Sequence, residues 1–306
     1  MNIIHSFISL VTPANPPLDM KWSSKAITIA AGNGDGQRVD QLNYPRGIDI
    51  DDEQTIYIAD SYNDRIVEWR RNATVGIVVA GGNGEGDQDD QLNNPLDVLI
   101  DYHNDALLIA DWGNRRVVRW SRRNGRSGQT IISNVRCFGL AINSKGDIYV
   151  VDDEKDEVRR WTIGNNQGLL VAGGNGRGDR LDQFNRPHYI SVDDHESIYV
   201  SDWGNHRVMK WIKNAKEGII VAGGQGRGNN LTQLYVPNGL FVDQWETVYV
   251  ADYGNDRIVR WLKDSKKGEI VANEKLDRPY DLAFDEDNNL YVVDNGHDRV
   301  QKFMPV

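Results

Sequence analysis

Hydrophobic residues in this chain come in short runs that are separated by equally short polar stretches. The segment from residue 47 to 82 shows the pattern: "GIDID", "TIYIAD", "RIVEW" and "GIVVAGG" are interrupted by "DDEQ", "SYND" and "RRNAT". β-Branched and aromatic residues fill the runs, whereas Gly, Asn and Asp fill the joints. No stretch has the periodicity of an amphipathic helix. The pattern predicts four short antiparallel strands that are joined by tight turns.

This four-strand unit occurs six times. Each copy closes its second strand with an Asp, and these residues stand 41 to 51 positions apart: Asp60, Asp111, Asp152, Asp202, Asp252 and Asp294. A Pro precedes the first strand in five copies, and Cys137 holds its place in the third: Pro45, Pro95, Pro187, Pro237 and Pro279. Repeats of this kind are typical of a β-propeller. We therefore expect an all-β fold with six four-stranded antiparallel blades.

The two ends of the chain supply one blade together. The last unit has only three strands, and the missing fourth strand matches "KAITIAAGNG" at residues 25–34. We expect this N-terminal strand to complete the last blade and to remove the open edges of a linear array. The predicted domains are an N-terminal arm at residues 1–24 and a propeller at residues 25–306.

The recurring phrase resembles a known family. "P-x-G-I-x-[IV]-D", followed by "[IL]-Y-[IV]-A-D-x-x-N-x-R-[IV]-x-x-W", is similar to the NHL repeat, and the similarity covers residues 25–306. The resemblance implies a six-bladed propeller such as those associated with tripartite-motif proteins and ubiquitin ligases, with a scaffold or target-recognition role. A ligase RING would need Cys/His clusters that this chain lacks, so a ligase role would require a partner or a missing segment. Blade 3 departs from the pattern, because Lys155 replaces Asn and Glu157 replaces Arg.

Positions that every blade shares are expected to serve the fold. A large aromatic residue ends each third strand and should stack between neighbouring blades: Trp69, Trp120, Trp161, Trp211, Trp261 and Phe303. The repeated Asp, Asn and Arg, such as Asp60, Asn63 and Arg65, should bond the turn backbone and fix the strand register.

Candidate ligand-binding residues are those that differ between blades. The two residues after each Pro position should surround one mouth of the central channel, and their divergence is where ligand choice could be encoded. The ligand-binding set that we predict from these positions is Arg46, Asp97, Phe138, His188, Tyr189, Asn238, Tyr280 and Asp281. The alternative is a channel lining that binds only water.

Loop lengths predict a groove across the same face. Long Gly-rich loops precede blades 1, 2, 4 and 5, whereas the loops before blades 3 and 6 are short, so two raised walls should flank a low path past Phe138 and Tyr280. One wall is acidic and the other basic: Glu85, Asp87, Asp89 and Asp90 face Arg177, Arg180, Arg186 and Arg227. Such a groove suits an extended peptide. The expected anchors are the aromatic residues of the face turns, since Trp and Tyr dominate interface hot spots: Tyr62, Trp112, Trp203 and Tyr253.

Composition narrows the remaining chemistry. The 306 residues carry a net charge of −10 and a single cysteine, which argues against nucleic-acid and membrane partners and excludes an internal disulfide. We expect a cytoplasmic monomer that binds a protein or peptide, without a catalytic residue, metal or cofactor. Secretion is left open.

Two alternative functions stay open at this point. One is a metal-dependent hydrolase or lyase with its site at the channel mouth, where Asp97, Asp281 and His188 could hold Ca²⁺ or Mg²⁺ if further oxygen ligands were present. Asp97 and Asp281 could also share a proton, although four blades separate them in sequence order. The other alternative is an RNA-binding NHL domain, which would need clustered basic and aromatic residues.

Overall fold

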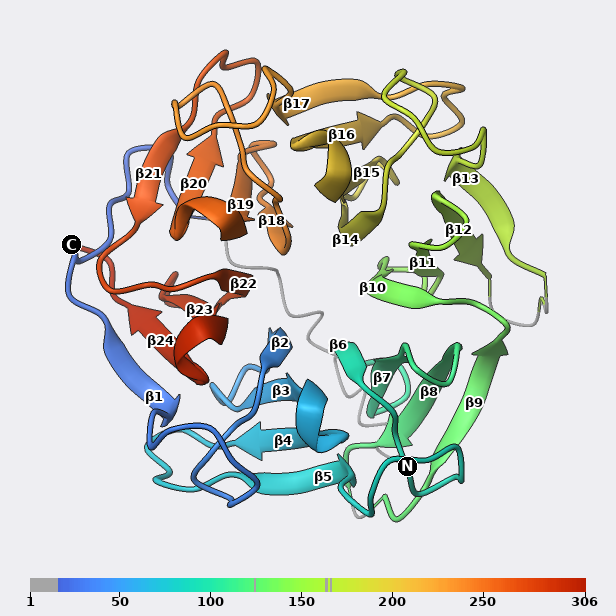
Figure 1. The fold of residues 1–306 in the computed structure, drawn as a ribbon, viewed down its shortest axis with the longest axis vertical. Coiled ribbons are helices and arrows are strands. Elements are labelled where there is room, and N and C mark those ends of the chain that lie inside the picture. Colours follow the sequence, from blue (N-terminus) through green and yellow to red (C-terminus); the bar gives the residue numbers. More distant parts are fainter. Residues whose placement is uncertain (1–15, 124, 163–164, 166) are drawn as a thin grey trace, which may run out of the picture.

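A computed structural model describes residues 16–123, 125–162, 165 and 167–306. Within them the chain forms a closed ring of six antiparallel sheets with four strands each, as the repeat predicts (Figure 1). Each blade's first strand lies at the axis and its fourth at the rim (Figure 1). The third-strand aromatic residues are buried, apart from the partly buried Trp161.

The strands follow one another in the order of the sequence. Blade 1 contains β2 (Pro45–Ile50), β3 (Ile56–Asp60), β4 (Arg65–Trp69) and β5 (Ile77–Gly81). Blade 2 contains β6 (Pro95–Asp101), β7 (Ala106–Asp111), β8 (Arg116–Ser121) and β9 (Gly128–Ser133). Blade 3 contains β10 (Cys137–Ile142), β11 (Ile148–Asp152), β12 (Glu157–Trp161) and β13 (Leu169–Gly173).

The second half of the ring repeats this arrangement. Blade 4 contains β14 (Pro187–Val192), β15 (Ile198–Asp202), β16 (Arg207–Trp211) and β17 (Ile219–Gly223). Blade 5 contains β18 (Leu240–Val242), β19 (Val248–Asp252), β20 (Arg257–Trp261) and β21 (Glu269–Ala272). Blade 6 contains β22 (Pro279–Phe284), β23 (Leu290–Asp294), β24 (Arg299–Phe303) and β1 (Ile27–Ala31). Short 3₁₀ turns η1 (Ser61–Asn63), η2 (Trp203–Asn205), η3 (Tyr253–Asn255) and η4 (Asn295–His297) link the second and third strands of four blades.

The N-terminal strand closes the ring. Strand β1 pairs antiparallel with β24, with Ile27 opposite Lys302 and Ala31 opposite Arg299. This confirms the predicted closure and leaves blade 6 with the same four strands as the others.

Residues just before β1 pack against blades 5 and 6. Trp22 is 7% exposed, its ring lies 6.0 Å from the ring of Tyr249 and 5.7 Å from that of Phe284, and its Nε1 donates to the carbonyl of Asn288 at 2.8 Å. Residues 16–24 of the predicted arm are thus in contact with the propeller, and residues 1–15 lie outside the described part of the chain.

The shared Asp, Asn and Arg residues hold the long loops. In blade 1, Nε of Arg65 donates to Asp60 at 2.6 Å, and its two terminal nitrogens donate to three backbone carbonyls in residues 37–41. Asn63 donates to the carbonyl of Gly36 and to Asp60. Charge-assisted bonds of this kind are stronger than neutral ones. The set therefore anchors the loop before its own blade, a role beyond the strand register that the sequence indicated.

The same clamp is present wherever a long loop precedes the blade. Its other copies are Asp111, Asn114 and Arg116 in blade 2, Asp202, Asn205 and Arg207 in blade 4, and Asp252, Asn255 and Arg257 in blade 5. In blade 6, Arg299 donates to Asp294 and to one loop carbonyl, that of Lys275. In blade 3, Glu157 stands in the place of the arginine and pairs with Arg159. The departure of blade 3 from the repeat is explained, because its preceding loop is short and leaves nothing to clamp.

Candidate functional site

The two faces of the ring carry different turns. One face, here the loop face, gathers the four long loops and the turns between second and third strands; the opposite face carries the turns between first and second strands (Figure 1). The predicted anchors lie in the loop-face turns, and most of the predicted mouth residues follow at the start of each first strand.

The channel is closed at the loop face by its own side chains. Phe138 stacks on His188 with ring centroids 3.7 Å apart, and the hydroxyl of Tyr189 donates to the carbonyl of Leu96, two blades away, at 3.0 Å. Tyr189 also meets Tyr280 edge-on at 6.1 Å. Phe138 and Tyr280, the expected floor of the groove, are only 5% and 6% exposed. The residues that we expected to surround an open mouth therefore form a plug.

His188 is a structural member of this plug. Its Nδ1 lies 2.6 Å from Oδ1 of Asn238, and its other face stacks on Trp203 at 5.1 Å. Burial lowers the pKa of His188 to about 3, and the positive charge of Arg46 acts in the same direction. The imidazole is neutral at physiological pH.

Arg46 is the predicted ligand-binding residue that places a charge at the loop face. Its guanidinium carbon lies 5.2 Å from the ring centre of Tyr280 and 5.6 Å from that of Tyr44. Among the described residues the guanidinium has no hydrogen-bond or ion-pair partner, and its Nε is fully buried without one. The side chain as a whole is partly exposed.

Tyrosines are grouped at this arginine: Tyr44 and Tyr280 contact its guanidinium, and Tyr62 and Tyr253 pack on those two rings. Tyr44 and Tyr62 stack in parallel with centroids 4.7 Å apart, and Tyr62 is 54% exposed. Tyr253 meets Tyr280 edge-on at 5.6 Å, and its pKa is raised to about 12, mainly by burial and further by a hydrogen bond with Tyr44. Tyr44, Tyr62 and Tyr253 together are called the tyrosine cluster below.

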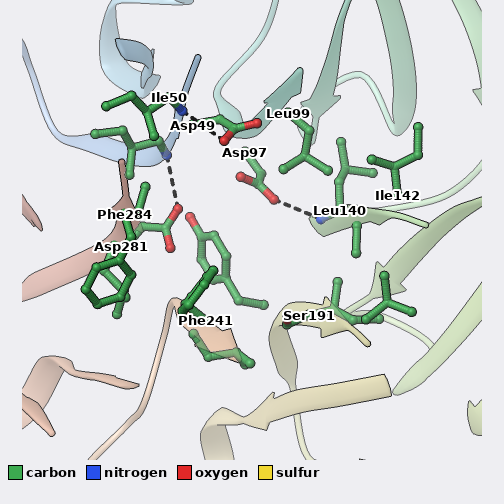
Figure 2. A pocket seen from close by; sticks show the side chains of 18 of the residues that line it. Asp49, Ile50, Asp97, Leu99, Leu140, Ile142, Ser191, Phe241, Asp281 and Phe284 are labelled. Atoms are coloured by element: carbon green, nitrogen blue, oxygen red, sulfur yellow. Dashed lines mark hydrogen bonds between the residues drawn. The ribbon is translucent and has the colours of Figure 1, made fainter. Parts of the chain in front are cut away.

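A cavity of about 290 Å³ lies beneath the plug and reaches the opposite face. Its lining runs from Asp97 and Tyr189, next to the plug, to Asp52 and Glu286 in the turns of the opposite face. Figure 2 shows the carboxylates of Asp97 and Asp281 at the centre of this space, with Asp49 beside them. Sequence order separates Asp97 from Asp281 by four blades, but ring closure places both next to blade 1.

The carboxylates join neighbouring blades through their backbones. Asp281 accepts the N–H of Ile48 at 3.0 Å and Asp97 accepts that of Leu140 at 2.8 Å (Figure 2). Asp49 accepts the N–H of Ile100 at 2.8 Å. Small and large residues alternate around the axis to make room for them: Gly47, Asp97, Gly139, Tyr189, Gly239 and Asp281. A Cβ at the first or last glycine of this series would lie 2.6 Å from the Cα of the following aspartate.

Burial dominates the ionisation of this cluster. It raises the pKa of Asp49 to about 6 and that of Asp97 to about 7. It raises the pKa of Asp281 well above the usual range, and the negative charge of Asp97 acts in the same direction. Backbone N–H donors oppose these shifts but are outweighed. At neutral pH the cluster therefore holds protons that isolated carboxylates would have lost.

The family comparison agrees with this architecture. The NHL repeat model matches residues 42–69, 184–211 and 276–303, which are the first three strands of blades 1, 4 and 6. The chain is an NHL-repeat β-propeller. A search of curated proteins finds no match to it.

Solved structures share the fold of this NHL propeller at low sequence identity. A protein of unknown function from Bacteroides thetaiotaomicron has a TM-score of 0.71 and 14% identity, over 94% of this chain and 77% of that one. A gluconolactonase from Xanthomonas campestris has a TM-score of 0.67 and 14% identity, over 97% of this chain and 99% of that one. A catalytically inactive virginiamycin B lyase from Staphylococcus aureus, solved with quinupristin, has a TM-score of 0.60 and 10% identity, over 94% of this chain and 100% of that one. These similarities concern the fold.

The candidate metal ligands of the NHL propeller are not gathered. Asp97 and Asp281 face the cavity, whereas His188 belongs to the plug and faces Asn238. Across the described residues, no three His, Cys, Asp or Glu side chains form a group that could hold a metal ion.

No helix in the described part of the chain has the length and apolar character needed to cross a membrane.

The basic wall is partly neutralised. Arg177 pairs with Asp156 at 3.0 Å and Arg180 with Asp182 at 2.9 Å, while the guanidinium of Arg227 lies 3.9 Å from the ring centre of Tyr235. Glu85, Asp87, Asp89 and Asp90 are exposed, and within the described ranges no cation pairs with them. The loop face is therefore more acidic than the residue counts of the two walls indicate.

The predicted anchors differ in how they are held. Trp112 donates from Nε1 to Asp153 at 3.2 Å and lies under Arg136, whose guanidinium is 5.1 Å from its ring centre. Trp203 rests on His188. Tyr62 is the most exposed of the four, and it stacks on Tyr44, whose ring lies near Arg46.

Sequence reasoning missed Tyr44 and Asp49. Tyr44 precedes Pro45, and only residues after the Pro position were considered. Asp49 looked like an ordinary strand residue. A comparison of the equivalent position in all six blades could have identified it as a candidate site residue. Among Asp49, Leu99, Ala141, Ser191, Phe241 and Ala283, it is the one charged residue.

Proposed function

We propose that this NHL propeller is a non-enzymatic binding module whose loop face recognises a peptide or an extended protein segment. The supporting observation is the tyrosine cluster beside Arg46, which combines an exposed aromatic surface with a guanidinium that has no hydrogen-bond or ion-pair partner in the described chain. Tyr and Arg are enriched among residues that dominate binding energy.

The loop face is rigid enough for such recognition. Each long loop is tied to its blade by an Arg and an Asn that bond its backbone carbonyls, as Arg65 and Asn63 do in blade 1. A preorganised surface loses little conformational entropy when a ligand binds, and affinity increases accordingly.

The plug favours binding on the surface over chemistry inside the channel. Phe138, Tyr189 and Tyr280 are almost completely buried, and they separate the cavity from the loop face. A ligand at the loop face therefore meets the tyrosine cluster rather than the carboxylates. A role in ubiquitin transfer would require a partner protein or a further segment, since these 306 residues hold a single cysteine, too few for a zinc-binding RING.

A library of random displayed peptides tests the proposal. We expect selection on the wild-type protein to enrich peptides whose affinity falls about 10-fold or more when Tyr62 is replaced by Ala. The double variant Tyr44→Ala/Tyr62→Ala should lose more. Isothermal titration calorimetry on synthetic copies of the enriched peptides measures both.

Trp245→Ala is the matched control. Trp245 is 50% exposed in the turn between β18 and β19, on the opposite face. Its replacement should leave peptide affinity unchanged. If the enriched peptides lose affinity equally with Trp245→Ala and Tyr62→Ala, or if none depends on Tyr62, the loop face is not the binding surface.

A further inference from the structure

We infer that Arg46 is a carboxylate-recognition residue, so that the peptide bound at the loop face carries an Asp, a Glu or a C-terminal carboxylate at the channel axis. This inference rests on the proposed function and names the chemistry of its ligand. It concerns a single contact, between the guanidinium of Arg46 and one carboxylate of the ligand.

Two other arginines of the loop face differ from Arg46 in their hydrogen-bond partners. Arg136 forms a bidentate pair with Asp153, at 2.8 and 2.7 Å, and Nε of Arg278 donates to Asp277 at 3.1 Å. Arg46 has aromatic neighbours but no acceptor among the described residues. The fold therefore supplies a carboxylate acceptor to each of these two guanidinium groups and none to that of Arg46.

The unsatisfied Nε has an energetic consequence. A buried donor without an acceptor lowers the stability of the folded protein, because the donor has lost its water. Stacking on Tyr280 does not supply an acceptor. The two terminal nitrogens are not buried in this way, and a ligand carboxylate would match them in a bidentate geometry and stabilise the charge of the whole guanidinium.

The surroundings of Arg46 favour one carboxylate over a polyanion. Tyr44 and Tyr280 offer ring surfaces to the guanidinium, and the nearby His188 is neutral. The loop before blade 2 carries four exposed carboxylates, at residues 85–90. A nucleic-acid backbone would place repeated negative charges along this acidic loop, whereas a peptide needs one acidic group at the axis.

A direct probe needs no library peptide. The Nε–H signals of the arginine side chains are recorded by ¹⁵N NMR, and the signal that disappears in Arg46→Met is assigned to Arg46. We expect N-acetylglutamate to shift this signal and N-acetylglutamine to leave it in place. The signal of Arg136, which is already paired, should not move.

The peptides enriched in the library provide the second arm. We expect most of them to contain Asp, Glu or a free C-terminal carboxylate, and replacement of that group by its amide should weaken wild-type binding about 10- to 100-fold. Arg46→Lys should recover only part of the affinity lost in Arg46→Met, because an ammonium cannot bind in bidentate fashion.

The two arms distinguish failure of this inference from failure of the proposed function. If no peptide depends on Tyr62 while N-acetylglutamate shifts Arg46, the carboxylate site stands and the peptide module does not. If peptides depend on Tyr62 but tolerate both amidation and Arg46→Met, the inference is overturned. Stronger competition by a uridine oligonucleotide than by the acidic peptide also overturns it, in favour of phosphate recognition.

Discussion

At the scale of single residues, Arg46 and Arg65 are opposite uses of the same side chain. Arg65 is buried, pairs with Asp60 and donates to three backbone carbonyls. Arg46 donates to nothing in the described chain. The repeat places Arg65 in a shared column, so its structural role was predictable. The unsatisfied state of Arg46 depends on which side chains meet at the axis, and a single sequence does not show this.

This difference predicts the stability of two matched variants. Arg46→Met should change the free energy of unfolding by less than about 0.5 kcal/mol, because the loss of the cation–π contacts with Tyr44 and Tyr280 is offset by the removal of a buried donor without an acceptor. Arg65→Met should cost about 3–5 kcal/mol, because it leaves Asp60 buried without its partner. Urea denaturation of both variants measures this. A large loss in Arg46→Met would show that the guanidinium serves the fold.

The carboxylate cluster predicts a pH dependence. The pKa of Asp97 rises on folding from 3.8 to about 7, so the native state binds more protons than the unfolded state between these values. Stability contributed by this group is therefore highest at low pH and decreases as the pH rises from about 4 to about 7.

Asp97→Asn should remove that contribution. The free energy of unfolding of the variant, relative to wild type, should increase from pH 4 to pH 8, with most of the change complete near pH 7. Groups outside the cluster titrate equally in both proteins and cancel in the difference, whereas Asp281, whose pKa the charge of Asp97 raises, changes the difference in the same direction. Chemical denaturation across this range is the measurement, and a constant difference would mean that Asp97 titrates normally in the folded protein.

At the scale of elements, hydrophobic alternation and turn residues were sufficient to predict every blade. Each strand buries one repeated set of residues, and the Asp that ends each second strand marks the register. The plug was not predictable in this way. Phe138, His188 and Tyr189 come from two adjacent strands whose contact is set by the ring, not by local sequence.

The clamps predict local loop dynamics. Arg257→Met should accelerate amide hydrogen exchange in residues 228–235, because the side chain bonds carbonyls of that loop. The equivalent loop at residues 178–185, which Arg207 holds, should exchange as in wild type. Equal acceleration in both loops would indicate global destabilisation rather than loss of a clamp.

At the scale of the whole molecule, closure by β1 was predictable because the last repeat lacks one strand and the N-terminal segment matches it. Closure also explains the cavity chemistry. It brings blade 6 next to blade 1 and thereby places Asp281 near Asp97 and Asp49.

Removal of residues 1–31 tests the contribution of closure to the fold. This truncation leaves β24 as an unpaired edge in blade 6, and we expect self-association that light scattering detects. Removal of residues 1–24 keeps β1 and should cost about 3–5 kcal/mol from the lost packing of Trp22, without self-association. A monomeric, fully stable protein lacking residues 1–31 would contradict the account.

The central claim is that the loop face binds a peptide through a carboxylate on Arg46. It is tested most directly by a double-mutant cycle measured by calorimetry, with one enriched peptide and its Glu→Gln counterpart, on wild type and on Arg46→Met. We expect the amide to weaken binding about 10- to 100-fold to wild type and to have no effect with Arg46→Met. An equal loss with both proteins would contradict the claim.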